Sequence, residues 1–224
     1  MKTSLKEVIE STVQIPCDDV ILQGVLAIPA DAAGLVIFAH GSGSSRFSPR
    51  NRMVASRMWD RKLGTLLFDL MTEQEATSDK TAELRFDIPF LTKRLISVTR
   101  WAQANKRSKE LSIGYFGAST GAAAALAAAA AIPEIQAVVS RGGRTDLADH
   151  VISWVDTPTL LIVGEKDHPV IEWNRNSFRQ MKCVKEIAMV PGATHLFEEK
   201  GALEEVADLA ASWFKVHFSK TPRS

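Results

Sequence analysis

The sequence is poor in cysteine, carries no excess of charge of one sign and contains no long hydrophobic run. Its two cysteines, Cys17 and Cys183, form neither a metal-ligand spacing nor a redox pair, so we expect two free thiols in a reducing compartment. A formal net charge of +1 gives no global field that would attract nucleic acid or a membrane surface. The longest apolar run, residues 121–132, is too short to cross a bilayer, which takes about 20 residues.

The beginning of the chain does not resemble a targeting segment. Residues 1–16, MKTSLKEVIESTVQIP, lack the apolar segment of a secretory signal peptide and mix acidic with basic side chains. The composition, 46% hydrophobic and 24% charged, is that of an ordinary globular protein, and 224 residues have room for one α/β domain with a sizeable core. These features predict a soluble, cytoplasmic protein that forms a single domain over residues 1–224.

Eight short segments have the composition of β-strands. The first two, TVQIP and VILQGVLAIP, flank an Asp-Asp pair that suits a turn, which predicts an antiparallel hairpin. Continuous apolar runs follow, and such runs are typical of strands buried on both faces of a parallel sheet. They are LVIFAH, GTLLFDL, LSIGYF, QAVVSRGG and PTLLIVG, and EIAMVP is the last strand.

Segments with helical spacing alternate with these strands. They cover residues 49–62, 84–104, 120–132, 170–181 and 202–217. This alternation predicts an open, doubly wound α/β sheet with helices on both faces. In such sheets the functional site lies at the carboxyl ends of the strands. Four turns at those ends carry unusual residues, namely HGSGSSRFSP, GASTG, GEKDHPV and GATHLF.

Ser119 is the candidate nucleophile. It lies in GASTG, between a buried strand and a helix, with glycine two residues before it and two residues after it. This context is typical of the sharp turn that exposes a nucleophilic serine. The alternative is a packing bend, because TGAAAALAAAAA predicts a small, buried helix. Both interpretations hold together, since the same bend exposes the serine.

A serine hydroxyl needs a base, and His195 in the loop after the last strand is the candidate. The other histidines are less suited by position. His40 precedes the glycine-rich loop, where it suits a structural hydrogen bond, and His168 follows the candidate acid. His150 lies in a polar patch and His217 near the end of the chain.

Asp167, just past the seventh strand, is the candidate acid that orients the imidazole of the base. Asp146 and Asp149 after the sixth strand are alternatives, and so is the neighbouring Glu165. The chain order of nucleophile, acid and base is the order found in α/β-hydrolases.

An oxyanion needs backbone N–H donors, and losing one typically costs about 3 kcal/mol of transition-state stabilisation. We expect one donor at Thr120, directly after the nucleophile. The other should come from HGSGSS, with Ser42 preferred and Gly41 second. The alternative for this loop is a phosphate-binding turn, but it lacks the Gly-Lys-Ser/Thr of a P-loop and the spacing of a dinucleotide fingerprint.

The segments FAHGSGSS, GYFGASTG, LLIVGEKD and GATHLF resemble the α/β-hydrolase fold, and within it the small, lidless dienelactone hydrolase-like group. The resemblance spans nearly the whole chain. It implies an eight-stranded, mostly parallel sheet with Ser119, Asp167 and His195 as the catalytic triad. Dienelactone hydrolases proper use a cysteine nucleophile, so the serine here favours an ester or thioester substrate. The stretch RTDLADHVISWVDT is too short for the cap domain of many relatives, so we expect an open site.

Several arginines cluster near the predicted mouth of the site. They are Arg46, Arg50 and Arg52 beyond the oxyanion loop, and Arg141 and Arg144 after the sixth strand. One interpretation is solvated surface charge. The other is an anionic substrate, contacted by Arg141 at the carboxyl end of its strand and by Arg46.

These residues predict a serine hydrolase that cleaves a small carboxylic ester or thioester through an acyl-enzyme. It would need no cofactor or metal ion, and its partner would be a small-molecule ester. The alternatives are a peptidase of the same fold and a non-catalytic binding module on a hydrolase scaffold. Two copies of the chain could also pair through the edge hairpin or the last helix to form a homodimer.

Overall fold

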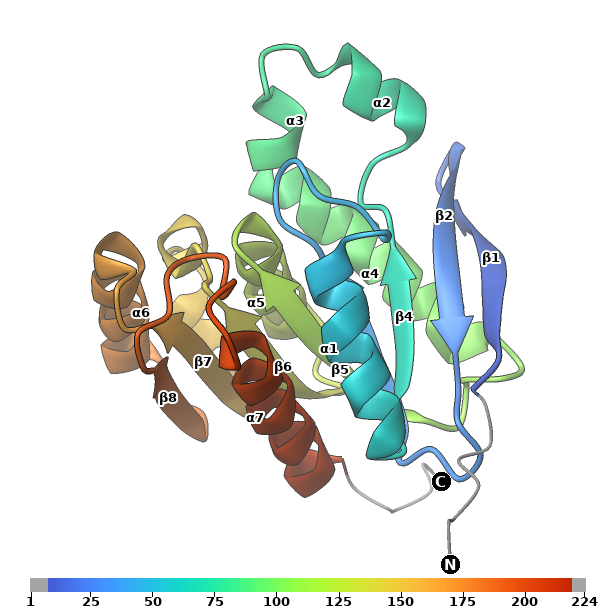
Figure 1. The fold of residues 1–224 in the computed structure, drawn as a ribbon. Helices are drawn as coiled ribbons and strands as arrows, with labels where there is room; N and C mark the ends of the chain where they lie inside the picture. The colour runs from blue at the N-terminus through green and yellow to red at the C-terminus, as the bar shows by residue number, and fades with distance from the viewer. Residues whose placement is uncertain (1–7, 219–224) are drawn as a thin grey trace, which may run out of the picture.

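Eight strands form one sheet in the order β1-β2-β4-β3-β5-β6-β7-β8 (Figure 1). The computed structural model describes residues 8–218, so the prediction for residues 1–7 lies outside the described part. The strand β2 pairs antiparallel with β1 and with β4, and the other pairings are parallel. This confirms the predicted α/β sheet with its antiparallel hairpin. The strands are β1 Glu10–Cys17, β2 Val20–Ala27, β3 Gly34–Ala39, β4 Gly64–Phe68, β5 Ser112–Ala118, β6 Ile135–Arg141, β7 Thr159–Gly164 and β8 Lys185–Val190.

Helices cover both faces of the sheet (Figure 1). One buried cluster joins a face of the sheet to α1 and α7, and a second joins the opposite face to α4 and α5. Among residues 8–218, no helix combines the length and the apolar character needed to span a lipid bilayer. The helices are α1 Pro49–Asp60, α2 Glu73–Ser78, α3 Glu83–Phe86, α4 Ile88–Ala104, α5 Thr120–Ala131, α6 His168–Gln180 and α7 Ala202–His217, with the 3-10 helices η1 Thr145–Ala148 and η2 Ile152–Trp154.

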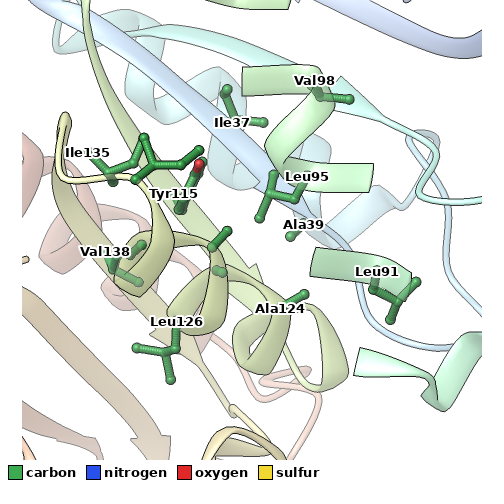
Figure 2. Packing of buried hydrophobic residues seen from close by; sticks show 14 of the residues in the cluster. Ile37, Ala39, Leu91, Leu95, Val98, Tyr115, Ala124, Leu126, Ile135 and Val138 are labelled. Carbon is green, nitrogen blue, oxygen red and sulfur yellow. The ribbon is translucent and has the colours of Figure 1, made fainter. Parts of the chain in front are cut away.

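The alanine-rich helix α5 lies in the middle of the core, as predicted. Its alanines are buried almost all round the helix, because small side chains let it approach the sheet and α4 closely. On α4, Leu91, Leu95 and Val98 recur at helical spacing and fill the same core (Figure 2). The buried Tyr115 hydroxyl hydrogen-bonds the Thr99 hydroxyl at 2.7 Å, which satisfies both polar groups. The first turn of α5 is therefore held on a rigid support.

One predicted helix is wrong in its extent. The segment 84–104 is interrupted at Asp87, where α3 ends and α4 begins. The Asp87 carboxylate accepts the Phe90 N–H at 2.9 Å, and Pro89 occupies the first turn of α4. Both features start a new helix rather than continue an old one. The helix α6 likewise begins at His168, two positions before the prediction, with Pro169 in its first turn.

The helices α2 and α3 stand beyond the end of β4, above the carboxyl ends of the strands (Figure 1). Neither contains a buried residue. The prediction missed α2, which is short and begins with a capping box: Thr72 accepts the Glu75 N–H, and the Glu75 carboxylate accepts the Thr72 N–H. The connection from β6 to β7 contains only η1 and η2, in agreement with the expected lack of a cap domain there.

Candidate active site

Ser119 lies on a sharp turn between β5 and α5. Its backbone has φ 51° and ψ −121°, a conformation that L-residues rarely adopt and that costs about 1–3 kcal/mol. The flanking glycines permit this turn. A Cβ atom on Gly117 would lie 2.5 Å from the Cα of Ala122, and one on Gly121 would overlap the carbonyl oxygen of Ala39. The local sequence therefore holds the serine at the carboxyl end of the sheet, in the strained geometry of a nucleophile turn.

The strand β6 and the loop after it hold this turn in place. The Ser119 N–H donates to the Arg141 carbonyl at 3.2 Å, and the Arg144 N–H donates to the Ser119 carbonyl at 3.1 Å. Both backbone groups of the strained residue are thus paired within the protein. Such pairing lets the surrounding structure maintain an unfavourable backbone conformation.

His195 and Asp167 form a hydrogen-bonded pair. The Nδ1 atom of His195 lies 2.7 Å from Oδ2 of Asp167. The carboxylate is largely buried, with 10% of its side chain exposed, whereas the imidazole is 39% exposed. The two loops meet because Gly164 ends β7 without a side chain. A Cβ atom there would lie 2.5 Å from the carbonyl oxygen of Ala193. The pair leaves Nε2 of the imidazole available for a second partner.

The imidazole lies beside the backbone that supports Ser119. A Cβ atom on Gly142 would lie 3.5 Å from Cε1 of His195 and 3.3 Å from its carbonyl oxygen. Gly142 directly follows Arg141, whose carbonyl accepts the Ser119 N–H. The three residues predicted from chain order therefore come to one end of the sheet, on the turns after β5, β7 and β8.

The predicted oxyanion donors lie next to Ser119. A Cβ atom on Gly41 would lie 3.1 Å from the Cβ of Ser119, so the loop after β3 passes directly over the nucleophile turn. The Ser42 N–H, however, donates to the hydroxyl of Thr120 at 2.9 Å. This bond joins the two halves of the candidate oxyanion site. It also means that the Ser42 amide has a protein partner in this structure, which the sequence did not indicate.

His40 has the structural role that its position suggested. Its Nε2 accepts the Leu70 N–H at 3.0 Å, and its Nδ1 lies 2.9 Å from the Gly41 carbonyl. This pattern assigns the proton to Nδ1, which donates to the carbonyl. Burial lowers the pKa of His40, with opposing effects from the Gly41 bond and Asp69. The neutral imidazole therefore joins the loop after β3, which carries the predicted oxyanion donors Gly41 and Ser42, to the residues just after β4.

A cavity of about 1090 Å³ extends from the oxyanion loop. Its walls come from the loop after β3, the end of β4 and the excursion that contains α2 and α3. Thr120 is part of its lining, whereas Ser119 and His195 are not. The wall formed by α2 was not predicted from the sequence, although Thr72 and Glu75 form the capping-box pattern that begins a helix. The cavity gives a substrate room beside the candidate nucleophile.

The other acidic candidates have different partners. Asp146 pairs with the guanidinium of Arg144 at 2.8 Å, and Glu165 accepts the Gly192 N–H at 2.7 Å. Burial raises the pKa of Asp149, helped by the charge of Asp146. Asp167 is thus the carboxylate that meets the predicted base.

The two arginines predicted as substrate contacts differ sharply. Arg46 lines the cavity, but its guanidinium is paired with the Asp69 carboxylate. Arg141 is only 8% exposed, and within residues 8–218 its Nε and Nη1 have no hydrogen-bond acceptor. Burial, together with the charge of Arg50, lowers the pKa of Arg141 to about 10. The guanidinium therefore remains positively charged at neutral pH.

Comparison with known proteins gives close and distant relatives. The sequence of this chain is 50% identical to that of a dienelactone hydrolase from Anabaena variabilis with a solved crystal structure. The two structures superpose with a TM-score of 0.93, over 95% of this chain and 99% of that one. This chain is 48% identical over 209 residues to a candidate phosphoribosyl transferase of Mycobacterium tuberculosis. That match covers 93% of this chain and 46% of the relative, so the chain spans about half the relative's length.

The fold also occurs in more distant proteins. Est1E from Butyrivibrio proteoclasticus is 16% identical, with a TM-score of 0.78 and coverage of 93% of this chain and 99% of that one. At this identity the likeness concerns the fold alone. The dienelactone hydrolase family itself matches residues 22–218. The chain therefore belongs to the dienelactone hydrolase family and has the α/β-hydrolase fold.

Proposed function

We propose that this protein is a serine hydrolase that cleaves a small carboxylic ester or thioester through an acyl-enzyme. The observation that carries the proposal is the 2.7 Å bond between His195 and Asp167, on loops beside the strained turn of Ser119. Membership of a hydrolase family and the adjoining cavity support the same function.

In the proposed reaction, Nε2 of His195 accepts the proton of the Ser119 hydroxyl while Oγ attacks the acyl carbon. Asp167 holds the Nδ1–H tautomer and stabilises the imidazolium that forms. The imidazolium then protonates the leaving alcohol or thiol, and the acyl group stays on Ser119. In the second half, His195 activates a water molecule, which releases the acid and restores the serine.

The tetrahedral intermediate needs two N–H donors. Thr120 supplies one at the first position of α5, where helix N–H groups have no intrahelical acceptor. The second comes from Ser42 or Gly41. If Ser42 serves, its N–H exchanges the hydroxyl of Thr120 for the substrate oxygen. Without substrate, the hydrogen bond from the Ser42 N–H to the Thr120 hydroxyl would then keep the loop close to Ser119.

The Mycobacterium tuberculosis relative is named as a candidate phosphoribosyl transferase, which suggests phosphoribosyl transfer as a second activity to consider. This chain matches 46% of that protein, so the named activity has room to reside in the other half. A peptidase of the same fold and a non-catalytic binding module are the remaining alternatives. The His195–Asp167 pair disfavours the binding module, because a buried carboxylate that orients an imidazole is the arrangement a general base needs.

A fluorophosphonate probe tests the proposal, because it phosphonylates only an activated serine. The wild type should be labelled and should hydrolyse phenyl acetate, and Ser119→Ala should lose both properties. Ser56→Ala, at an exposed serine of α1 outside the lining of the cavity, is the matched control and should keep both. A folded wild type that takes no label beside a reactive esterase standard would overturn the assignment.

The cellular setting is part of the proposal. Cys17 and Cys183 are free thiols, as predicted, and they suit a cytoplasmic location.

The expected small-molecule ester substrate agrees with the size of the cavity. Whether the chain forms a homodimer through β1 or α7 is a prediction that light scattering in solution would test.

A further inference from the structure

The cavity beside α2 includes the predicted oxyanion site. Gly41, Ser42 and Thr120 are all part of its lining, and a Cβ atom on Gly41 would lie 3.1 Å from the Cβ of Ser119. In the proposed reaction, the carbonyl oxygen of the ester lies against these backbone N–H groups while Ser119 attacks the carbon that carries it. The cavity therefore adjoins the position of the reacting carbon.

Ser119 lies between the cavity and the proposed base along the sheet. The walls come from β2, the loop after β3 and the segment after β4, whereas Ser119 follows β5 and His195 follows β8, beyond β6 and β7 (Figure 1). The leaving oxygen has to lie beside the imidazole of His195, because the imidazolium protonates it. The acyl group extends from the reacting carbon in another direction. The cavity lies on the side away from His195, which suits the acyl group rather than the leaving group.

Apolar side chains from four separate segments line the cavity. They are Ile21 on β2, Phe47 in the loop after β3, Met71 after β4 and Leu91 on α4. Ile21 and Phe47 are 53% and 56% exposed, so both leave apolar surface in water that a bound chain would cover. Each CH₂ group buried there is worth about 0.8 kcal/mol. A volume of about 1090 Å³ also gives room for a group much larger than acetyl.

The charged side chains of the lining do not favour an anionic acyl group. Arg46 is paired with the Asp69 carboxylate, and Arg85 donates to the Asp79 carboxylate at 2.7 Å. Glu73 adds a further negative charge to the lining. A carboxylate on the acyl group would lose water there and meet guanidinium groups that already have anionic partners. An uncharged chain has no such cost.

We infer that this cavity binds the acyl group of the ester, and that the group is an uncharged chain longer than acetyl, such as hexanoyl. The inference rests on the proposed function and specifies the acyl half of its substrate. The cavity-lining positions of α2 then determine which acyl groups fit. Ala76, in the middle of this helix, is the position where a larger side chain would narrow the cavity.

Two ester series test which half of the substrate the cavity binds. Phenyl acetate, phenyl butanoate and phenyl hexanoate differ only in the acyl group, and ethyl, butyl and hexyl acetate differ only in the alcohol. We expect kcat/KM to rise about 10- to 100-fold from phenyl acetate to phenyl hexanoate, and to vary within about fivefold along the alcohol series. The monophenyl ester of adipic acid, which ends its acyl chain in a carboxylate, should react at least about tenfold more slowly than phenyl hexanoate.

A variant of the wall tests where the acyl chain binds. Ala76→Phe should reduce the ratio of kcat/KM for phenyl hexanoate to that for phenyl acetate about tenfold, because the ring takes up room in the cavity. Ala104→Phe, at an exposed alanine of α4 outside the lining, is the matched control and should leave the ratio unchanged. If Ala76→Phe does not fold, Ile21→Thr replaces it and should reduce the ratio about threefold. Equal losses on both phenyl esters would mean a structural effect and would overturn the inference.

The remaining outcomes separate this inference from the proposed function. A larger gain along the alcohol series would assign the cavity to the leaving group and overturn the inference, and so would faster turnover of the adipate ester than of phenyl hexanoate. Turnover of phenyl acetate that depends on Ser119, without a preference for longer acyl groups, would overturn this inference alone. A wild type that hydrolyses none of these esters would overturn the proposed function itself.

Discussion

The imidazole of His195 lies 2.7 Å from the carboxylate of Asp167, although 28 positions separate them in the chain. The contact depends on the backbone between their loops as well as on the two side chains. The Lys166 N–H donates to the Ala193 carbonyl at 2.9 Å, and Gly164 leaves room for this approach. The sheet therefore fixes the orientation of the proposed base before any substrate arrives.

Replacing the acid tests this relationship. Asp167→Asn should lower kcat for phenyl acetate by about 10³- to 10⁴-fold, because an amide at this place favours the wrong imidazole tautomer. Glu165→Gln is the matched control, since that carboxylate bonds the Gly192 N–H, and it should keep kcat within about threefold. Similar losses in both variants, with circular dichroism unchanged, would count against Asp167 as the orienting acid.

The bond from the Ser42 N–H to the Thr120 hydroxyl gives a second prediction. Thr120→Val removes the acceptor and keeps the shape, so the oxyanion loop loses one anchor. A single hydrogen bond of this kind is worth about 0.5–1.5 kcal/mol, so kcat/KM should fall about two- to tenfold. Thr120→Ser keeps a hydroxyl and should stay close to the wild type. Steady-state kinetics on phenyl acetate measures both, and an unchanged Thr120→Val enzyme would argue against the anchor.

Stability should depend on Gly121, two residues after Ser119. Gly121→Ala brings a methyl group against the Ala39 carbonyl on β3, so the free energy of unfolding should fall by about 3 kcal/mol. Gly192→Ala is the comparison. Its φ of +69° is unfavourable for alanine, but nothing lies within 4 Å, so about 1 kcal/mol should be lost. Urea denaturation gives both values, and equal losses would contradict the packing explanation.

The buried His40 predicts a dependence of stability on pH. Burial lowers its pKa in the folded protein, whereas the unfolded chain titrates at about 6.5. The unfolded state therefore binds more protons below that pH, and the free energy of unfolding should fall as the pH drops from 7.5 to 5.5. One group contributes at most about 1.4 kcal/mol per pH unit. His40→Gln should flatten this dependence in urea titrations, and an identical slope in both proteins would refute it.

Much of the fold was predictable because its signals are local. Continuous apolar runs identified the buried strands, and the glycines around Ser119 identified the sharp turn between β5 and α5. The site residues were predicted from their positions after strands, since parallel strands bring their carboxyl ends to one edge. The break at Asp87 was missed, because the apolar spacing continues through it while the cap depends on one side chain.

Long-range pairing was not predictable from the sequence. Nothing near Arg46 in the chain indicates that Asp69, on the next strand's end, neutralises it. Nor does the sequence indicate that Nε and Nη1 of Arg141 lack an acceptor within residues 8–218, while Arg94 bonds the Glu75 carboxylate. These differences arise only when separate strands and helices pack against one another.

The helices α2 and α3 allow the shape of the cavity to be changed with little effect on the stability of the fold. They wall the cavity, yet none of their residues is buried. Substitutions at exposed positions generally change stability by less than about 0.5 kcal/mol. A library confined to the exposed cavity-lining positions of α2, Glu73, Gln74, Ala76, Thr77 and Ser78, would therefore vary the shape and polarity of the cavity and leave the turn at Ser119 unchanged. This segment is the natural starting point for directed evolution of substrate preference.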